Sequence, residues 1–178
     1  LTDLLLERLV QKTGQYQLSR SDRELIATAS ALHDIGKIGI DEKILNKPGR
    51  LTPEEFEIMK THTVIGAAML KHLTAYQDEA IVKIAYQICR WHHERYDGNG
   101  YPDGLKGEDI PIAAQVVSLV DVYDALVSPR VYKKAFPPEQ AMHKIKNGEC
   151  GVFNPPLLEC LKEIPDQIRA LDVTPQVN

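Results

Sequence analysis

The sequence has few cysteines and no long apolar run. Its three cysteines, Cys89, Cys150 and Cys160, are an odd number without metal-site spacing, so neither a closed disulfide framework nor a cysteine-based metal site is expected. No apolar run approaches the roughly 18 residues that span a bilayer, and no charged-then-apolar signal segment opens the chain. These absences predict a cytoplasmic domain without membrane contact.

Net charge is also low, and no repeat or low-complexity tract interrupts the chain. The formal net charge is −4 over 178 residues, and both signs are spread along the sequence, which argues against a nucleic-acid polymer as partner. With 43% apolar residues, the chain is able to bury one sizeable core. We expect a single domain over residues 1–178. Leu1–Leu6 enters an amphipathic helical pattern midway, which indicates a domain excised from a longer chain.

Helical periodicity dominates, and the alternation typical of strands never persists, so we predict an all-α bundle. Two capping boxes are expected, Ser21 with Glu24 and Thr52 with Glu55, the second with Pro53 in the first turn. The predicted helices cover residues 2–14, 22–34, 53–60, 62–73, 77–93, 111–127, 138–147 and 155–170. Glycine, proline, aspartate and asparagine punctuate two irregular segments, Gly36 to Arg50 and Tyr96 to Pro111.

Two short motifs carry the chemistry. His92 and His93 open the segment HHERYDGNGYP, and His33-Asp34 is followed by Lys37. Imidazoles and carboxylates together suit divalent transition metals. A metal site in a helical bundle needs inward-facing side chains from elements distant in sequence. The candidate ligands are His33, Asp34, His62, His92, His93 and Asp121.

Each candidate also has an ordinary structural interpretation. His33 and Asp34 end an apolar helical pattern, and His62 lies at a helix junction where a histidine is often a cap. Asp121 interrupts an apolar run, so it either faces solvent or is compensated by positive charge. A purely structural role is harder to assign to His92 and His93, because two unpaired imidazoles are costly to bury. Asp124 is a weaker candidate that would orient a ligand, and His72 and His143 fit ordinary amphipathic patterns.

From about residue 22 to residue 161, the chain resembles the HD-GYP branch of the HD metal-dependent phosphohydrolases. His33-Asp34 matches the HD pair, and Gly100-Tyr101-Pro102 matches the GYP signature. The resemblance implies an HD-domain helical bundle with two irregular active-site loops. It also implies two or three divalent metal ions, most often iron or manganese, with Asp34 bridging two ions and His33 binding one.

The resemblance further implies hydrolysis of cyclic di-GMP to linear pGpG or GMP, with Asp34 and Lys37 as catalytic residues. Lys37, Arg130 and Lys133 would contact the substrate phosphates; a basic residue after a helix also compensates its carbonyl dipole. Such domains often follow a sensory or receiver module, which makes an upstream module and signalling proteins the expected partners.

The sequence departs from the HD-GYP pattern in places. Val127, Pro129 and Val131 replace the more usual polar, acidic and proline positions, and Val152 and Asn154 replace a histidine and an aspartate. The histidine and glutamate that precede the HD pair in the family are not found in residues 1–6. Three alternatives therefore remain open: a weak or inactive cyclic-dinucleotide sensor that binds a ligand or protein, an HD phosphohydrolase for another nucleotide, and a purely structural helical domain.

Overall fold

The computed structural model describes residues 1–129 and 135–164. These residues form nine α-helices and four short 3-10 helices, without a strand, which confirms the predicted all-α class. The α-helices are α1 (Thr2–Thr13), α2 (Arg20–Ala29), α3 (Glu42–Leu45), α4 (Pro53–Lys60), α5 (His62–Lys71), α6 (Ala80–Trp91), α7 (Ile112–Val127), α8 (Pro138–Lys146) and α9 (Pro155–Glu163). The 3-10 helices are η1 (Ser30–Leu32), η2 (Ile35–Gly39), η3 (Thr74–Tyr76) and η4 (Gly107–Asp109).

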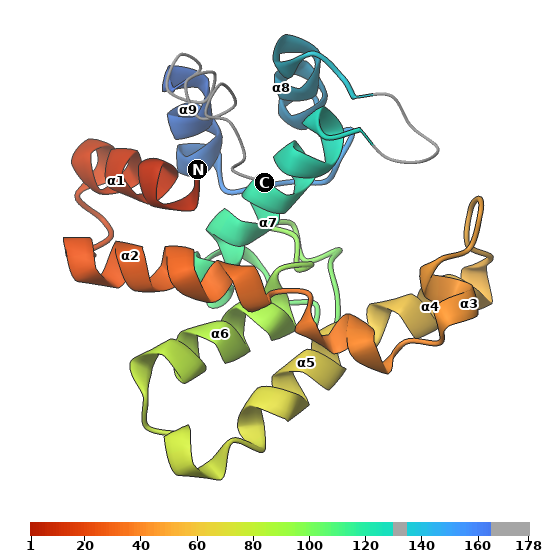
Figure 1. Cartoon of the computed structure of the whole chain (residues 1–178). Helices are drawn as coiled ribbons and strands as arrows, with labels where there is room; N and C mark the ends of the chain where they lie inside the picture. The colour runs from red at the N-terminus through yellow and green to blue at the C-terminus, as the bar shows by residue number, and fades with distance from the viewer. Residues whose placement is uncertain (130–134, 165–178) are drawn as a thin grey trace, which may run out of the picture.

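Helix α7 runs through the middle of the molecule, with α1 and α9 toward one end and the α5–α6 pair toward the other (Figure 1). Leu5, Ile88, Leu119 and Leu157 are fully buried and come from α1, α6, α7 and α9 respectively. Burial of each such side chain contributes about 1.5–3 kcal/mol. The apolar core therefore fixes α6 and α7, which hold residues of the site described below.

Helices α3 and α4 project away from α1 and α9 (Figure 1). The predicted capping box at Thr52 is confirmed: the Glu55 amide donates to Thr52 Oγ1 over 3.2 Å, and the Thr52 amide donates to the Glu55 carboxylate over 2.7 Å. This box starts α4 at Pro53, as expected. No described helix is long and apolar enough to cross a membrane.

The start of α2 was predicted wrongly. The capping box pairs Ser19 with Asp22 rather than Ser21 with Glu24, because the Asp22 amide donates to Ser19 Oγ over 3.1 Å and the Ser19 amide donates to Asp22 over 2.8 Å. The helix accordingly begins at Arg20, and Ser21 lies inside its first turn.

Helix ends also differ from the expectation. The predicted helix over 22–34 stops as an α-helix at Ala29 and tightens into η1, so His33 and Asp34 lie in a turn between η1 and η2. The predicted helix over 77–93 begins at Ala80 and ends at Trp91, one residue before His92. The last helix is described to Glu163, and residues 165–170 of its predicted range lie outside the described residues.

Candidate metal centre

Four of the six predicted ligands converge on one point. One nitrogen or oxygen atom from each of Asp34, His62, His92 and His93 lies within 4.8 Å of the others. Asp34 comes from the turn between η1 and η2, His62 is the first residue of α5, and His92 and His93 directly follow α6. The packing of α5 against both η2 and α6 therefore assembles a cluster that is scattered along the sequence.

The carboxylate of Asp34 is the centre of this cluster. Its Oδ1 atom lies 3.4 Å from Nε2 of His62 and 3.9 Å from Nε2 of His92. That oxygen is buried, and no hydrogen bond to it is made in the described structure. A buried carboxylate oxygen without a partner is costly, and a bound cation is a partner that would remove this cost. The site therefore offers four side chains able to hold a metal ion.

Three imidazoles are held with the same nitrogen turned inward. Nδ1 of His33 lies 2.8 Å from the Ser30 carbonyl oxygen, Nδ1 of His62 lies 2.7 Å from that of Met59, and Nδ1 of His92 lies 2.9 Å from that of Ile88. A carbonyl oxygen only accepts, so each Nδ1 carries the proton. Each Nε2 then presents a lone pair, as is usual for metal-binding histidines whose other nitrogen is anchored.

Burial keeps the inner imidazoles neutral. It lowers the pKa of His62 and of His93. For His92, burial acts together with the neighbouring His33 and His62 to lower the pKa to about 3. Neutral imidazole is the form that ligates metals, so these side chains need not lose a proton before they bind a metal ion.

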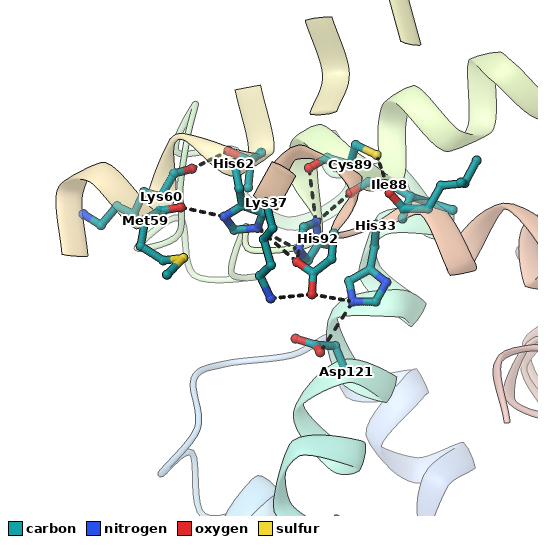
Figure 2. A network of polar contacts seen from close by, with 12 residues as sticks. His33, Lys37, Met59, Lys60, His62, Ile88, Cys89, His92 and Asp121 are labelled. Carbon is teal, nitrogen blue, oxygen red and sulfur yellow. Dashed lines mark hydrogen bonds and ion pairs between the residues drawn. The ribbon is translucent and has the colours of Figure 1, made fainter. Parts of the chain in front are cut away.

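His33 and Asp121 lie at the edge of the cluster. Nε2 of His33 is 3.3 Å from Asp34 Oδ2 and 3.8 Å from Asp121 Oδ1. Burial disfavours the charged His33 ring, but the contact with Asp34 outweighs burial and raises the pKa of His33. Figure 2 shows His33, His62, His92 and Lys37 turned toward one another, with Asp121 approaching from α7. All six predicted ligands thus lie in one region, and their role as ligands stays a prediction.

Lys37 contacts the cluster and is also partly exposed to solvent. Its Nζ atom donates to Asp34 Oδ2 over 2.5 Å. Burial opposes the charged carboxylate, but hydrogen bonds from His33 and Lys37 prevail and lower the pKa of Asp34. In the described structure Lys37 therefore neutralises Asp34. The other two predicted phosphate contacts, Arg130 and Lys133, lie outside the described residues.

The weaker candidates are not part of the cluster. Asp124 is exposed and accepts a hydrogen bond from Ser128 Oγ over 3.3 Å, so it does not orient a residue of the site. His72 and His143 are exposed as well. The interpretation of these two histidines as ordinary surface residues agrees with their positions.

Close backbone packing places Asp34 beside His62. A Cβ atom built on Gly36, in η2, would lie 2.5 Å from the backbone nitrogen of Gly66, in α5. Two glycines at this crossing let the backbones approach to a distance that a side chain would prevent.

Glu94 is a residue of the site that the sequence motifs did not single out. It is 2% exposed, and its Oε1 accepts hydrogen bonds from the amides of Asp103 and Gly104 over 2.7 and 3.1 Å. On the outer side, Arg90 forms a bidentate ion pair with Asp103 over 2.7 and 2.8 Å. The loop after His93 is therefore held by a buried acceptor and a surface ion pair. The available signal in the sequence was a glutamate directly after two histidines.

The loop brings Tyr101 back onto the cluster. The Tyr101 ring stacks on the His93 ring, with centroids 4.8 Å apart and planes 26° from parallel. This return requires glycine at position 100, because a Cβ atom there would lie 2.3 Å from the Arg95 backbone nitrogen and 2.4 Å from Cα of Glu94. Gly100 thus shapes the loop that returns Tyr101 to the cluster.

Comparisons with known proteins agree with this geometry. Residues 5–152 match the model of a family described as "HD domain". The chain is 46% identical over 166 residues to a "Cyclic di-GMP phosphodiesterase" of Thermotoga maritima, covering 91% of this chain and 43% of that protein. It is 37% identical over 168 residues to "3'3'-cGAMP-specific phosphodiesterase 2" of Vibrio cholerae, covering 94% of this chain and 31% of that protein.

A solved structure shows the same fold. Bd1817, described as an HDG"Y"P protein from Bdellovibrio bacteriovorus, matches with a TM-score of 0.65 and 23% identity, covering 93% of this chain and 50% of that one. The chain spans less than half the length of these two curated relatives.

Proposed function

This chain belongs to the HD domain family, and we propose that it is a metal-dependent phosphodiesterase that hydrolyses cyclic di-GMP. The observation that carries the proposal is the buried Oδ1 of Asp34, which has no hydrogen-bond partner and lies beside Nε2 of His62 and of His92. The substrate is inferred from the 46% identity to a protein named cyclic di-GMP phosphodiesterase. The confirmed resemblance to the HD-GYP branch points to the same substrate.

The proposed metal ligands are the residues that meet around Asp34. His62, His92, His93 and Asp34 form the inner set, and His33 and Asp121 complete it from the edge. We propose two or three divalent ions, iron or manganese, because mixed imidazole and carboxylate ligands suit both. Bound divalent ions would activate a water molecule and withdraw charge from the phosphoryl oxygens.

The anchored histidines and the basic side chains have separate proposed roles in the reaction. The anchored Nδ1 atoms of His33, His62 and His92 prevent ring rotation, so the site is organised before substrate binds. Lys37 pairs with Asp34 in the described structure. Were Asp34 to ligate a metal ion, the ammonium group of Lys37 would be available to a nonbridging phosphoryl oxygen. Arg130 and Lys133 are proposed to hold phosphate on the strength of the sequence pattern.

The longer relatives suggest a regulatory setting. Because the chain spans less than half of their length, we propose that the domain works beside a sensory or receiver module in a cytoplasmic signalling protein.

A specific observation favours a second candidate substrate. A relative with 37% identity is named a 3'3'-cGAMP-specific phosphodiesterase, and that cyclic dinucleotide differs from cyclic di-GMP in one base. A protein that binds either compound tightly without cleaving it would instead be a sensor. Hydrolysis of mononucleotides alone would indicate another nucleotide phosphohydrolase.

The decisive experiment incubates the intact parent protein, reconstituted anaerobically with iron or manganese, with cyclic di-GMP. The products are resolved by chromatography beside those of the Asp34→Ala variant. We expect pGpG or GMP from the unmutated protein alone. Intact cyclic di-GMP after incubation with confirmed metal-loaded protein would contradict the proposed activity, and equal turnover by Asp34→Ala would contradict the proposed site.

A further inference from the structure

A row of three rings in contact extends from the candidate metal centre to the protein surface: His93, Tyr101 and Phe56. Tyr101 stacks on His93, and the Phe56 ring meets Tyr101 edge to face at a centroid distance of 6.3 Å. Phe56 is in the middle of α4 and is 45% exposed. Because the Phe56 ring is only partly buried, its exposed surface is available to a ligand.

A cation lies close to both Phe56 and Tyr101. Nζ of Lys60 is 5.1 Å from the centroid of Phe56 and 5.5 Å from that of Tyr101. Its ionic partner is Glu57, at 2.6 Å, whose side chain is 70% exposed. Solvent-exposed ion pairs contribute about 0–1 kcal/mol, so Glu57 holds Lys60 only weakly. The ammonium group is therefore positioned by the rings and is able to exchange its carboxylate partner for another acceptor.

We propose that Phe56 and Lys60 form a nucleobase subsite that selects guanine. This inference rests on the proposed function and specifies how its substrate is recognised. A purine stacks on the exposed Phe56 ring, as bases do on aromatic side chains. Lys60 donates hydrogen bonds to guanine O6 and N7, both of which accept.

The same geometry disfavours adenine. At the corresponding edge adenine presents the N7 acceptor beside an amino donor, and an ammonium group has no acceptor for that donor. Cyclic di-GMP and 3'3'-cGAMP differ at one of their two bases, where adenine replaces guanine. A cationic donor next to a stacking ring therefore provides the chemistry that separates guanine from adenine at this subsite.

The position of the subsite suits a nucleotide. Phe56 is two ring contacts from His93, so a base on Phe56 leaves the attached sugar and phosphate directed along Tyr101 toward the proposed metal ligands. Tyr101 and Lys60 come from the loop after α6 and from α4. The two segments that border the cluster thus meet where the base would lie.

The test compares Phe56→Leu and Lys60→Met with Ile58→Leu in the metal-reconstituted parent protein. Ile58 is also on α4 and is 46% exposed, so its variant is a matched control for Phe56. Three diesters are used: cyclic di-GMP, cyclic di-AMP and the base-free bis(p-nitrophenyl) phosphate. Dissociation constants of the two cyclic dinucleotides are measured by calorimetry alongside kcat and KM.

We expect Phe56→Leu to raise the Kd and KM for cyclic di-GMP about tenfold, since base stacking contributes about 1–3 kcal/mol. Its rate with the base-free diester should not change. Lys60→Met should reduce the preference for cyclic di-GMP over cyclic di-AMP about tenfold. Ile58→Leu should resemble the unmutated protein in every assay.

Equal losses on all three diesters would show that the two side chains only support the fold, and unchanged constants would show that the base binds elsewhere. Either result overturns the subsite. Should the unmutated protein bind cyclic di-GMP without cleaving it, the proposed activity fails, while the Kd values of the variants still decide the subsite. Absence of both binding and cleavage would refute both proposals.

Discussion

Gly36 packs directly against the backbone of His62. A Cβ atom on Gly36 would lie 1.9 Å from the His62 carbonyl oxygen and 2.5 Å from the backbone nitrogen of Gly66. This contact sets the separation between the turn that carries Asp34 and the helix that carries His62. The metal centre therefore depends on the absence of a side chain at position 36.

Replacing Gly36 with alanine should destabilise the protein. The added methyl group meets backbone that cannot rotate away, so we expect a loss of about 3 kcal/mol in the free energy of unfolding, measured by urea denaturation. Gly39→Ala, in the same 3-10 helix, is the control because its methyl group meets only the Ile65 side chain, at 3.0 Å and beyond. Similar losses in both variants would contradict the proposed packing requirement.

Replacing Lys37 with alanine should weaken substrate binding without emptying the metal site. Lys37 is a cation beside Asp34 but offers no lone pair to a metal while it is protonated. Steady-state kinetics with cyclic di-GMP should show KM raised about tenfold, a loss near 1.4 kcal/mol. Lys43→Ala, at an exposed position in α3, should behave as the unmutated protein. Loss of bound metal from Lys37→Ala would assign this lysine a structural role instead.

Replacing Glu94 with alanine should loosen the loop that carries Tyr101. The change removes the shared acceptor of the Asp103 and Gly104 amides, and the loss of hydrogen bonds to a charged carboxylate costs about 2 kcal/mol. Hydrogen exchange at these two amides should accelerate, whereas Glu57→Ala, at an exposed position in α4, should leave exchange unchanged. Unaltered protection in Glu94→Ala would show that Asp103 and its partners hold the loop without Glu94.

Local patterns predicted the fold class and the start of α4. Thr52, Pro53 and Glu55 specify a helix start within four residues, and the structure follows them. The start of α2 was less determined, because Ser19 with Asp22 and Ser21 with Glu24 both have the spacing of a capping box. The pair that forms is Ser19 with Asp22. At the next position, Nη1 of Arg23 lies 3.4 Å from Oε1 of Glu7 in α1. Contacts between helices are not visible in a local pattern.

The candidate site was predictable in its residue types but not in its arrangement. Paired His92 and His93 and the His33-Asp34 motif indicated metal chemistry. Their convergence depends on how η2 crosses α5 at Gly36 and Gly66, which periodicity does not report. The contact of Lys60 with Tyr101 joins residues 41 positions apart, so Phe56 and Lys60 gave no signal in the sequence beyond an ordinary amphipathic helix.

The most direct test of this account is the metal content of the anaerobically purified parent protein, measured by elemental mass spectrometry for the unmutated chain, Asp34→Ala and His72→Ala. His72 is an exposed histidine outside the cluster and serves as the control. We predict at least two divalent ions per chain in the unmutated protein and in His72→Ala, and a loss of bound metal in Asp34→Ala with helicity retained. Full metal occupancy in Asp34→Ala would contradict the central claim that this carboxylate organises the metal centre.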